Sequence, residues 1–560
     1  MNFLLFRNSN FRDMKSASTQ RWVTAPIAVM QKGDWLGLVS VLALAIALRL
    51  MFYTGFFGSD EVTYVETAVK IASGDWRASN YIGATRYGMN LPVALSIYLF
   101  GLSQASANLW PFLCSVGEVA TVFVIARWVW STRVAIVSAG LLAILPLHVH
   151  FAGRMMADPP LAFFLTLSVA LLLAAANTKR SMTYFVAGLA WGGVFWVKES
   201  VAILYLPVFA ILVVLLDRIN RRWLWLFVGM GLAVAANCAL MFIVADNPMH
   251  VFTIMRTAVK KIGGMAVESS PWFYIRYLFF DIKHTFLIGF LFAAGTILFG
   301  FGFAARHKDA AYGTQFIVLW AFLMLGMFSL AVVSFSPIKL VMKQTNYMLI
   351  FLGPMVLIAG WFLASLPRRI FIPLSVFVAC GSVVLAALEQ QAITVFTANS
   401  KAAYAFVRDH PGSYLIGTTN NQRAVNFYSM FENRWELRDR VFSFSEMASL
   451  IGSTSENTLK NRVTGDNVFA VLDLQNVNWG ERPGAIRRLS DVPKCWLYMG
   501  KLTPAALGNG RWISQGLVAA VALLPESQHQ RFLSILQPVS MPNPAYLFRV
   551  EDSCLTGPLG

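Results

Sequence analysis

Residues 35–64 read WLGLVSVLALAIALRLMFYTGFFGSDEVTY, a long apolar run followed by two adjacent carboxylates, Asp60 and Glu61. The apolar part, residues 35–54, is long enough to cross a bilayer, since a spanning helix needs about 20 mostly apolar residues. Acidic groups at the mouth of a membrane helix are costly unless they face water or a cationic partner. We therefore expect Asp60 and Glu61 to form the floor of a reaction site where the first span leaves the membrane.

The composition is that of a polytopic membrane protein. Of the 560 residues, 57% are hydrophobic and 13% are charged, whereas soluble domains carry about 25% charged residues. The formal net charge of +17 would suggest a nucleic-acid partner in a soluble protein. Here we attribute it to basic residues in short cytoplasmic loops and to a site for an anionic, phosphate-bearing lipid, and we expect no nucleic-acid partner.

Hydropathy predicts eleven spans. They lie near residues 35–54, 110–130, 133–151, 159–177, 183–198, 201–216, 223–245, 284–304, 314–334, 347–366 and 370–390. Residues 91–102 are shorter and follow Pro92, which favours a re-entrant or interface helix. With a cytoplasmic N-terminus, every loop on that side is basic, as the positive-inside rule requires; these loops contain Arg127 and Arg133, Lys179 and Arg180, Arg218 to Arg222, Arg306 to Lys308, and Arg368 and Arg369.

After about residue 392 the composition becomes mixed, and strand-like runs such as 413–417 and 467–473 alternate with helical ones. This alternation predicts a small α/β domain, which an odd number of spans places outside the cytoplasm. Cys495 and Cys554 lie in it and are predicted to form a disulfide, as such an environment permits. The predicted layout is a cytoplasmic tail (1–34), a transmembrane catalytic domain (35–391) with outside loops 55–109 and 246–283, and a soluble α/β domain (392–560).

Three acidic residues on the outside face are candidates for chemistry. Asp60 and Glu61 could simply start a helix, as a cap and a favourable dipole partner, or supply a general base for an acceptor hydroxyl or amine. Asp158 precedes Pro159 and Pro160, an ordinary helix start. In the functional interpretation, Asp158 is a second carboxylate near Asp60, and Arg154 pairs with either.

Cations on the same face are candidates for binding an anionic group. Lys198-Glu199 interrupts apolar sequence and is either an interfacial ion pair or a point-charge contact to a phosphate. Lys339 and Lys343 are four residues apart, so on a helix they would share a face and clamp a phosphate or pyrophosphate. The predicted substrate-binding residues are Tyr64, Arg86, Arg154, Lys198, Glu199, Lys339, Lys343 and Tyr347.

The succession of motifs resembles the GT-C superfamily of integral membrane glycosyltransferases, in the branch of protein O-mannosyltransferases and lipid A aminoarabinose transferases. The motifs are Asp60-Glu61-x-x-Tyr64, Arg86-Tyr-Gly-x-Asn-Leu-Pro92, Arg154-x-x-x-Asp158-Pro-Pro, Gly188-x-x-x-Gly192 with Val197-Lys198-Glu199, and Lys343-Gln-Thr-Asn-Tyr347. The resemblance spans residues 35–366. The chain departs from aminoarabinose transferases, which are expected to have more spans, by ending in a soluble domain after eleven.

The resemblance implies an inverting transfer of a sugar from a polyprenyl phosphate to a lipid, glycan or protein of the cell envelope, at the periplasmic face of a bacterial inner membrane. Asp60 would be the catalytic base, and Glu61 and Asp158 would match acidic positions of the same cavity. Arg86, Lys198 and Lys343 would match cations near the lipid phosphate. No cofactor is required, although Asp60, Glu61 and Asp158 could gather around a divalent metal. The alternatives are a transporter or flippase of an anionic lipid-linked substrate, and a non-catalytic envelope assembly protein.

Overall fold

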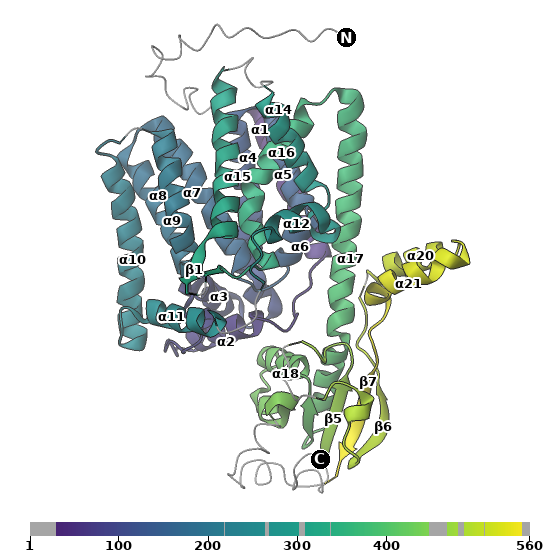
Figure 1. Cartoon of the computed structure of the whole chain (residues 1–560). Coiled ribbons are helices and arrows are strands. Elements are labelled where there is room, and N and C mark those ends of the chain that lie inside the picture. Colours follow the sequence, from purple (N-terminus) through teal and green to yellow (C-terminus); the bar gives the residue numbers. More distant parts are fainter. Residues whose placement is uncertain are drawn as a thin grey trace.

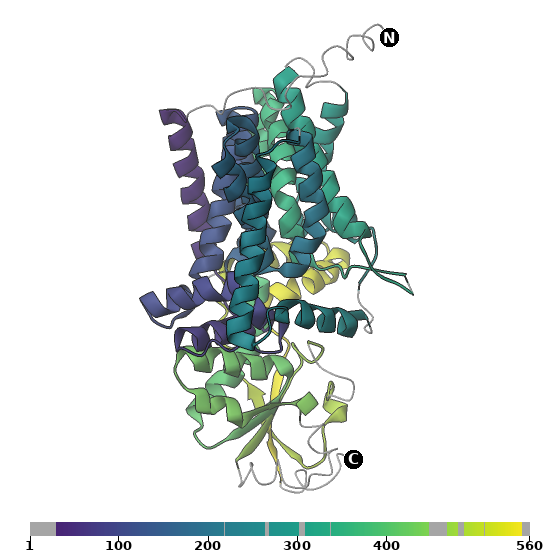
Figure 2. The ribbon, with the colours of Figure 1, turned by 90° about the vertical axis from the view of Figure 1, so that its left-hand side faces the viewer.

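The computed structural model describes residues 30–217, 219–263, 268–301, 308–336, 338–446, 467–479, 486–508 and 510–551. A bundle of long apolar helices carries a smaller sheet domain at one end, which we call the sheet end (Figures 1 and 2). The bundle helices are α1 (Lys32–Met51), α4 (Gln104–Val129), α5 (Thr132–Ile144), α6 (Pro146–Ala152), α7 (Asp158–Thr178), α8 (Ser181–Val197), α9 (Glu199–Leu216), α10 (Trp223–Ala245), α14 (Ile288–Gly300), α15 (Lys308–Leu330), α16 (Leu349–Ser365) and α17 (Arg368–Asp409).

Each of the eleven predicted spans overlaps one or more helices of the described residues. In the described part of the chain, eight helices are long and apolar enough to cross a membrane, and α5 with α6 form a ninth span bent by 61°. The bend falls at Leu145-Pro146, where proline cannot continue the helical hydrogen bonds. The remaining two, α8 and α14, are apolar but shorter. The protein is therefore a multi-pass α-helical membrane protein, as the sequence predicts.

A buried polar network ties α1 to its neighbours inside the bundle. The Arg49 guanidinium donates to Ser115 Oγ at 2.8 Å and lies 2.6 Å from His148 Nδ1, while His148 Nε2 lies 2.9 Å from Glu118 Oε2. All four side chains are almost completely buried. Charged groups inside a membrane protein normally face the interior and pair with one another, so this network fixes where α1 ends and the 53–60 loop begins.

Short elements cover the sheet end of the bundle. They are α2 (Glu61–Ala72), η2 (Ile82–Thr85), α3 (Tyr87–Phe100), α11 (His250–Gly263), α12 (Phe273–Phe280), α13 (Ile282–Thr285), the antiparallel pair β1 (Val332–Phe335) and β2 (Ile338–Leu340), and η4 (Thr345–Met348). In Figure 2, α2, α3 and α11 run roughly across the bundle axis. The amphipathic helix predicted from Val62 to Ala72 is α2, and the short helix predicted over 91–102 is α3.

The C-terminal region folds as a five-stranded mixed sheet in the order β4-β3-β5-β7-β6. The strands are β3 (Tyr414–Gly417), β4 (Val441–Ser443), β5 (Val468–Asp473), β6 (Trp496–Leu502) and β7 (Ala545–Val550). β3 pairs parallel with β4 and β5, whereas β7 pairs antiparallel with β5 and β6. With α18 (Thr419–Phe431), this confirms the predicted small α/β region.

Helix α17 joins the two regions without a break. It runs for 42 residues from Arg368 to Asp409, so the predicted boundary at residue 391 falls inside a continuous helix. Its last turns carry Tyr404 and Val407 into the core of the sheet domain. The sheet domain is thus held on the bundle by a rigid helix as well as by the contacts described below.

Candidate active site

The 53–60 loop places Asp60 at the sheet end of α1. Gly55 and Gly58 have φ of +68° and +97°, in the region that favours glycine. Glu61 stabilises this loop, because its Oε1 accepts hydrogen bonds from the backbone N–H groups of Phe57 (2.7 Å), Gly58 (2.6 Å) and Ser59 (3.1 Å). Glu61 is fully buried. Its geometry is that of a residue that positions the loop, and it does not line the cavity described below.

Asp60 is partly exposed and lies in the wall of that cavity. The Tyr81 hydroxyl donates to Asp60 Oδ1 at 2.9 Å. Burial, and then the neighbouring Asp60 charge, raise the pKa of Tyr81, so the hydroxyl keeps its proton and remains a donor. Tyr81 therefore fixes one oxygen of Asp60 and leaves the other to meet a substrate.

Asp158 is paired with Lys198 and does not lie beside Asp60 in the cavity wall. Its Oδ1 accepts from Lys198 Nζ at 3.2 Å and from Asn346 Nδ2 at 3.0 Å, and the Lys198 ammonium also lies 4.3 Å from the centre of the Tyr347 ring. Lys198 occupies the break between α8 and α9. The salt-bridge partner of Lys198 is therefore Asp158. Glu199, the next residue in the sequence, is also buried.

The two arginines reach the cavity from different elements. Arg86 precedes α3 and donates to the hydroxyl of buried Tyr64. Arg154 follows α6, lies 3.5 Å from Glu61 Oε2, and stacks over the Phe57 ring at 4.3 Å. Arg154 therefore pairs with Glu61, which settles the choice that the sequence left open. Both arginines are more than nine-tenths buried.

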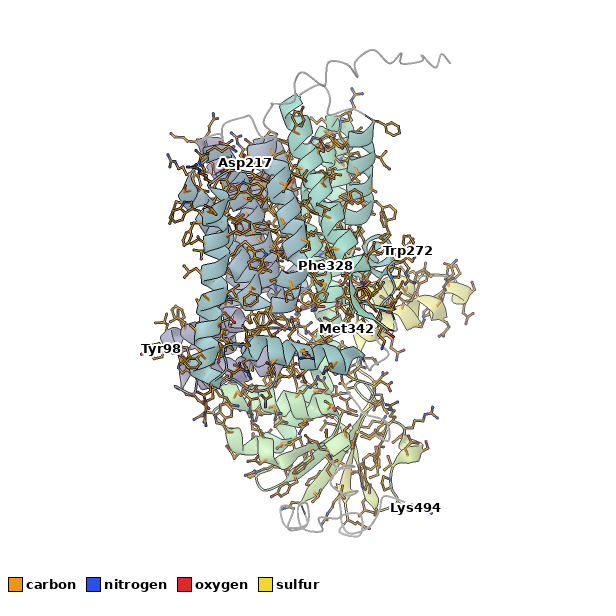
Figure 3. All side chains as sticks on the ribbon, turned by 60° about the vertical axis from the view of Figure 1, so that its left-hand side comes forward. Tyr98, Asp217, Trp272, Phe328, Met342 and Lys494 are labelled. Carbon is orange, nitrogen blue, oxygen red and sulfur yellow. The ribbon has the colours of Figure 1, made fainter. Side chains whose placement is uncertain are left out.

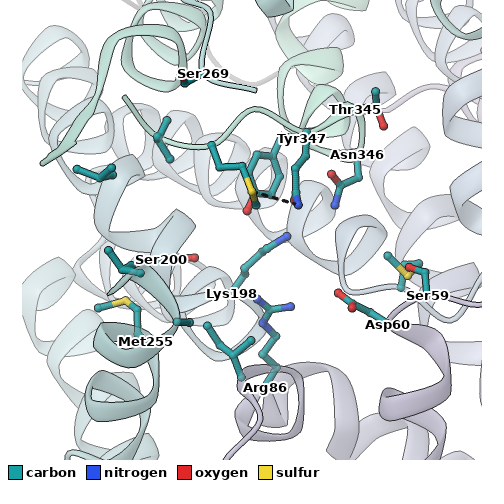
Figure 4. A pocket seen from close by; sticks show the side chains of 18 of the residues that line it. Ser59, Asp60, Arg86, Lys198, Ser200, Met255, Ser269, Thr345, Asn346 and Tyr347 are labelled. Carbon is teal, nitrogen blue, oxygen red and sulfur yellow. Dashed lines mark hydrogen bonds between the residues drawn. The ribbon is translucent and has the colours of Figure 1, made fainter. Parts of the chain in front are cut away.

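These side chains surround one cavity of about 820 Å³ at the sheet end. Figure 4 shows Asp60, Arg86 and Lys198 extending into the same opening from three different segments. Of the predicted site residues, the cavity wall contains Asp60, Arg86, Arg154, Lys198, Lys339 and Tyr347. Four of the other predicted residues do not line the cavity: Glu61, Tyr64, Asp158 and Glu199. Among the described residues, four cations and a single carboxylate thus line the cavity, which favours an anionic ligand.

The predicted helical clamp of Lys339 and Lys343 is wrong, because residues 338–340 form strand β2 and residues 341–344 form no helix. Lys339 stays in the cavity wall, whereas Lys343 Nζ donates to the carbonyls of Phe328 (2.6 Å) and Ser329 (2.9 Å) at the end of α15. Burial lowers the pKa of Lys343 to about 8. Lys343 therefore holds the β1–β2 segment against α15.

The C-terminal region supplies a wall residue that the sequence did not reveal. Trp479, which follows β5, lines the cavity and donates from its indole N–H to the Gly58 carbonyl at 3.1 Å. It also meets the Phe57 ring edge-on at 5.0 Å. Its partners are more than 400 positions away in the chain, and no local pattern signals such a contact.

The predictions about a metal ion and about the disulfide both stay predictions. In the described ranges, no group of three or more His, Cys, Asp and Glu side chains is placed to hold a metal ion. The carboxylates expected to gather instead face separate partners, with Glu61 on Arg154 and Asp158 on Lys198. Cys554 lies outside the described residues, so its pairing with Cys495 stays a prediction.

The fold and the cavity define a multi-pass membrane protein with a cation-rich cavity where the bundle meets a soluble domain. Residues 89–241 match the family model described as dolichyl-phosphate-mannose-protein mannosyltransferase. The match contains Arg154, Asp158 and Lys198, and it confirms the resemblance to the GT-C superfamily of membrane glycosyltransferases. Among curated proteins, none matches this sequence.

Several solved structures share partial similarity with this chain. ArnT from Cupriavidus metallidurans bound to undecaprenyl phosphate is 16% identical, with 79% of this chain and 94% of that chain covered and a TM-score of 0.47. The apo state of the same protein is 17% identical, with 76% and 81% covered and a TM-score of 0.44. The apo oligosaccharyltransferase from Archaeoglobus fulgidus is 11% identical, with 92% and 88% covered and a TM-score of 0.49.

Proposed function

We propose that the protein is a glycosyltransferase that moves a sugar from a polyprenyl-phosphate donor to a hydroxyl or amine of an envelope lipid, glycan or protein. The observation that carries this proposal is the single cavity in which Asp60 faces Arg86, Lys198, Lys339 and Arg154. The family match supports it, because the description of that family names a sugar on a polyprenyl phosphate.

The cavity wall suits an amphiphilic donor. Arg86 and Lys198 carry the charge that a phosphodiester needs, and donors aimed at developing negative charge are an effective way to lower a reaction barrier. The α11 and β1–β2 side of the cavity contributes apolar side chains, among them Met255, Val259 and Val333. A prenyl chain would leave through this side into the membrane while its phosphate stays with the cations.

The reaction is a single displacement with inversion. The acceptor oxygen or nitrogen attacks the anomeric carbon as the bond from that carbon to the phosphate oxygen breaks. Asp60 accepts the proton that the acceptor loses, with Tyr81 holding its other oxygen in place. The lipid phosphate leaves as an anion with the electron pair of the broken bond, so nearby cations matter more here than a general acid.

Replacing Asp60 by Asn tests the proposal. The full-length protein, reconstituted in liposomes, is given radiolabelled sugars on undecaprenyl phosphate, with isolated cell envelope as the source of acceptor. Loss of a general base lowers rates by about 10²- to 10⁴-fold, so Asp60→Asn should abolish measurable transfer. Asp75→Asn is the matched control, since Asp75 is partly exposed at the same end and accepts a hydrogen bond from Arg77.

Two outcomes would contradict the proposal. Transfer by Asp60→Asn at the rate of the unchanged protein would remove Asp60 from the chemistry. Movement of intact labelled lipid across the bilayer, with no cleavage of the sugar–phosphate bond by the unchanged protein, would instead establish the flippase alternative.

A further inference from the structure

A helical hairpin projects from the sheet domain beside α17. It consists of α20 (Arg511–Val521) and α21 (Glu526–Ser540), inserted between β6 and β7. Figure 1 shows it at the level of the lower part of the bundle, well away from the strands that it interrupts. Both helices pack on α17 and on each other. Nothing in the proposed reaction uses it.

The segment that leads into the hairpin runs along α17 toward the membrane. The Ala505 N–H donates to the Ala398 carbonyl at 3.2 Å. Three residues later, Gly508 lies against Thr394, and Gly510 then lies within contact of Gln390 and Gln391. The hairpin therefore begins where the predicted span of α17, residues 370–390, leaves the membrane. It lies beside the apolar part of that helix.

The outward surface of the hairpin is apolar along α20 and at the turn, whereas α21 exposes polar side chains such as Gln530 and Ser534 as well as apolar ones. Residues 516–524 contain no polar side chain. Leu523, at the turn, is 88% exposed, and Trp512 and Ile535 are 71% and 62% exposed. Phe532 and Ile535 are three residues apart, so they share a face of α21. Large exposed apolar patches on soluble surfaces mark sites of contact with a membrane or a protein.

Helix α17, on which the hairpin packs, exposes apolar side chains of its own. Ile370, Val376, Phe377 and Val384 on that helix are also largely exposed, as expected of a span that faces lipid. The hairpin adds to the same side of the bundle at its sheet end. Its helices have 11 and 15 residues, too few to cross a bilayer, which needs about 20.

We propose that the α20–α21 hairpin lies in the membrane interface, with its apolar side chains among the outermost acyl chains. Amphipathic helices of this kind bury their apolar face about 5–10 Å into the boundary between headgroups and acyl chains. Arg511, at the start of α20, and Arg531, within α21, extend toward the phosphates, since long basic side chains keep their charged ends at the interface. The hairpin is thus a second membrane attachment of the sheet domain, in addition to α17.

Spin labels on the full-length protein in lipid nanodiscs test the proposal. The labels are placed at Leu523→Cys and Ile535→Cys, in a chain with Cys238→Ala and Cys380→Ala. Val376→Cys on α17 is the lipid-facing reference, and Met499→Cys, exposed on β6, is the aqueous reference. At 523 and 535 we expect collisions with oxygen to exceed those with a water-soluble nickel complex, as at 376, with the ratio reversed at 499.

Two results would overturn the proposal. Labels at 523 and 535 that collide mainly with the nickel complex would place the hairpin in water. Labels protected from both reagents would mean that a second copy of the chain or another protein covers it. Each variant is checked first for a single peak in gel filtration, and the background chain without an added cysteine must remain unlabelled.

Discussion

At the residue scale, Gly58 is where the loop that carries Asp60 touches the C-terminal region. Its carbonyl accepts from Arg423 (2.5 Å) and from Trp479, and its α-carbon faces Asn420 so closely that a β-carbon would lie 1.6 Å from Asn420 Oδ1. Asn420 is fully buried and bonded to Ser400 and Asn476, so it has little freedom to move away. The loop is thus held by Glu61 on one side and by the sheet domain on the other.

Replacing Gly58 by Ala should therefore displace the loop and lower sugar transfer sharply. Gly74→Ala is the matched control, because Gly74 has a similar φ of +92° but nothing within 4 Å of an added β-carbon. The backbone cost alone is about 1–2 kcal/mol in both variants, whereas only Gly58→Ala also collides with Asn420. Thermal unfolding and the transfer assay measure the two effects, and equal losses in both variants would contradict this explanation.

At the scale of elements, the segment after β5 links the sheet domain to the cavity through Trp479. Trp479→Phe keeps a ring against Phe57 but removes the hydrogen bond to Gly58, which is worth about 0.5–1.5 kcal/mol. We expect a modest loss of transfer for Trp479→Phe and a larger one for Trp479→Ala, which also opens the cavity wall.

The control for this pair is Trp435→Phe, since the Trp435 indole also donates locally, to Asn433 at 3.1 Å, but lies away from the cavity. Transfer rates at saturating donor, with unfolding temperatures measured alongside, separate a local effect from general destabilisation. Trp479→Ala with unchanged transfer would show that the sheet domain does not shape the cavity.

The helices and strands also show which parts of the fold and of the site can be predicted from the sequence. Apolar runs of about 20 residues fix the spans, and strand-like runs such as 467–473 fix the sheet, because both signals are local. The helical clamp of Lys339 and Lys343 failed because spacing alone cannot distinguish a helix from a strand in so short a segment. Tyr81, Asn346 and Trp479 were missed because their roles depend on contacts between segments far apart in the chain.

At the scale of the whole molecule, basic residues gather in the loops at the end of the bundle opposite the sheet. The loops at the end opposite the sheet carry Arg127, Arg133, Lys179, Arg180, Arg221, Arg222, Arg368 and Arg369. Figure 3 shows Asp217 at this end and Lys494 at the far side of the sheet domain. Because basic loops are retained in the cytoplasm, the cavity and the sheet domain should both face the periplasm of a bacterial cell.

Cysteine labelling in intact cells tests this orientation. Ile219→Cys, in the loop between α9 and α10, and Met499→Cys, on β6, replace side chains that are 83% and 57% exposed, in a chain with Cys238→Ala and Cys380→Ala. A maleimide that cannot cross membranes should label Met499→Cys in intact cells, and Ile219→Cys only after lysis. The opposite pattern would place Asp60 in the cytoplasm. The acceptor would then be a cytoplasmic molecule, and the envelope acceptors proposed above would be excluded.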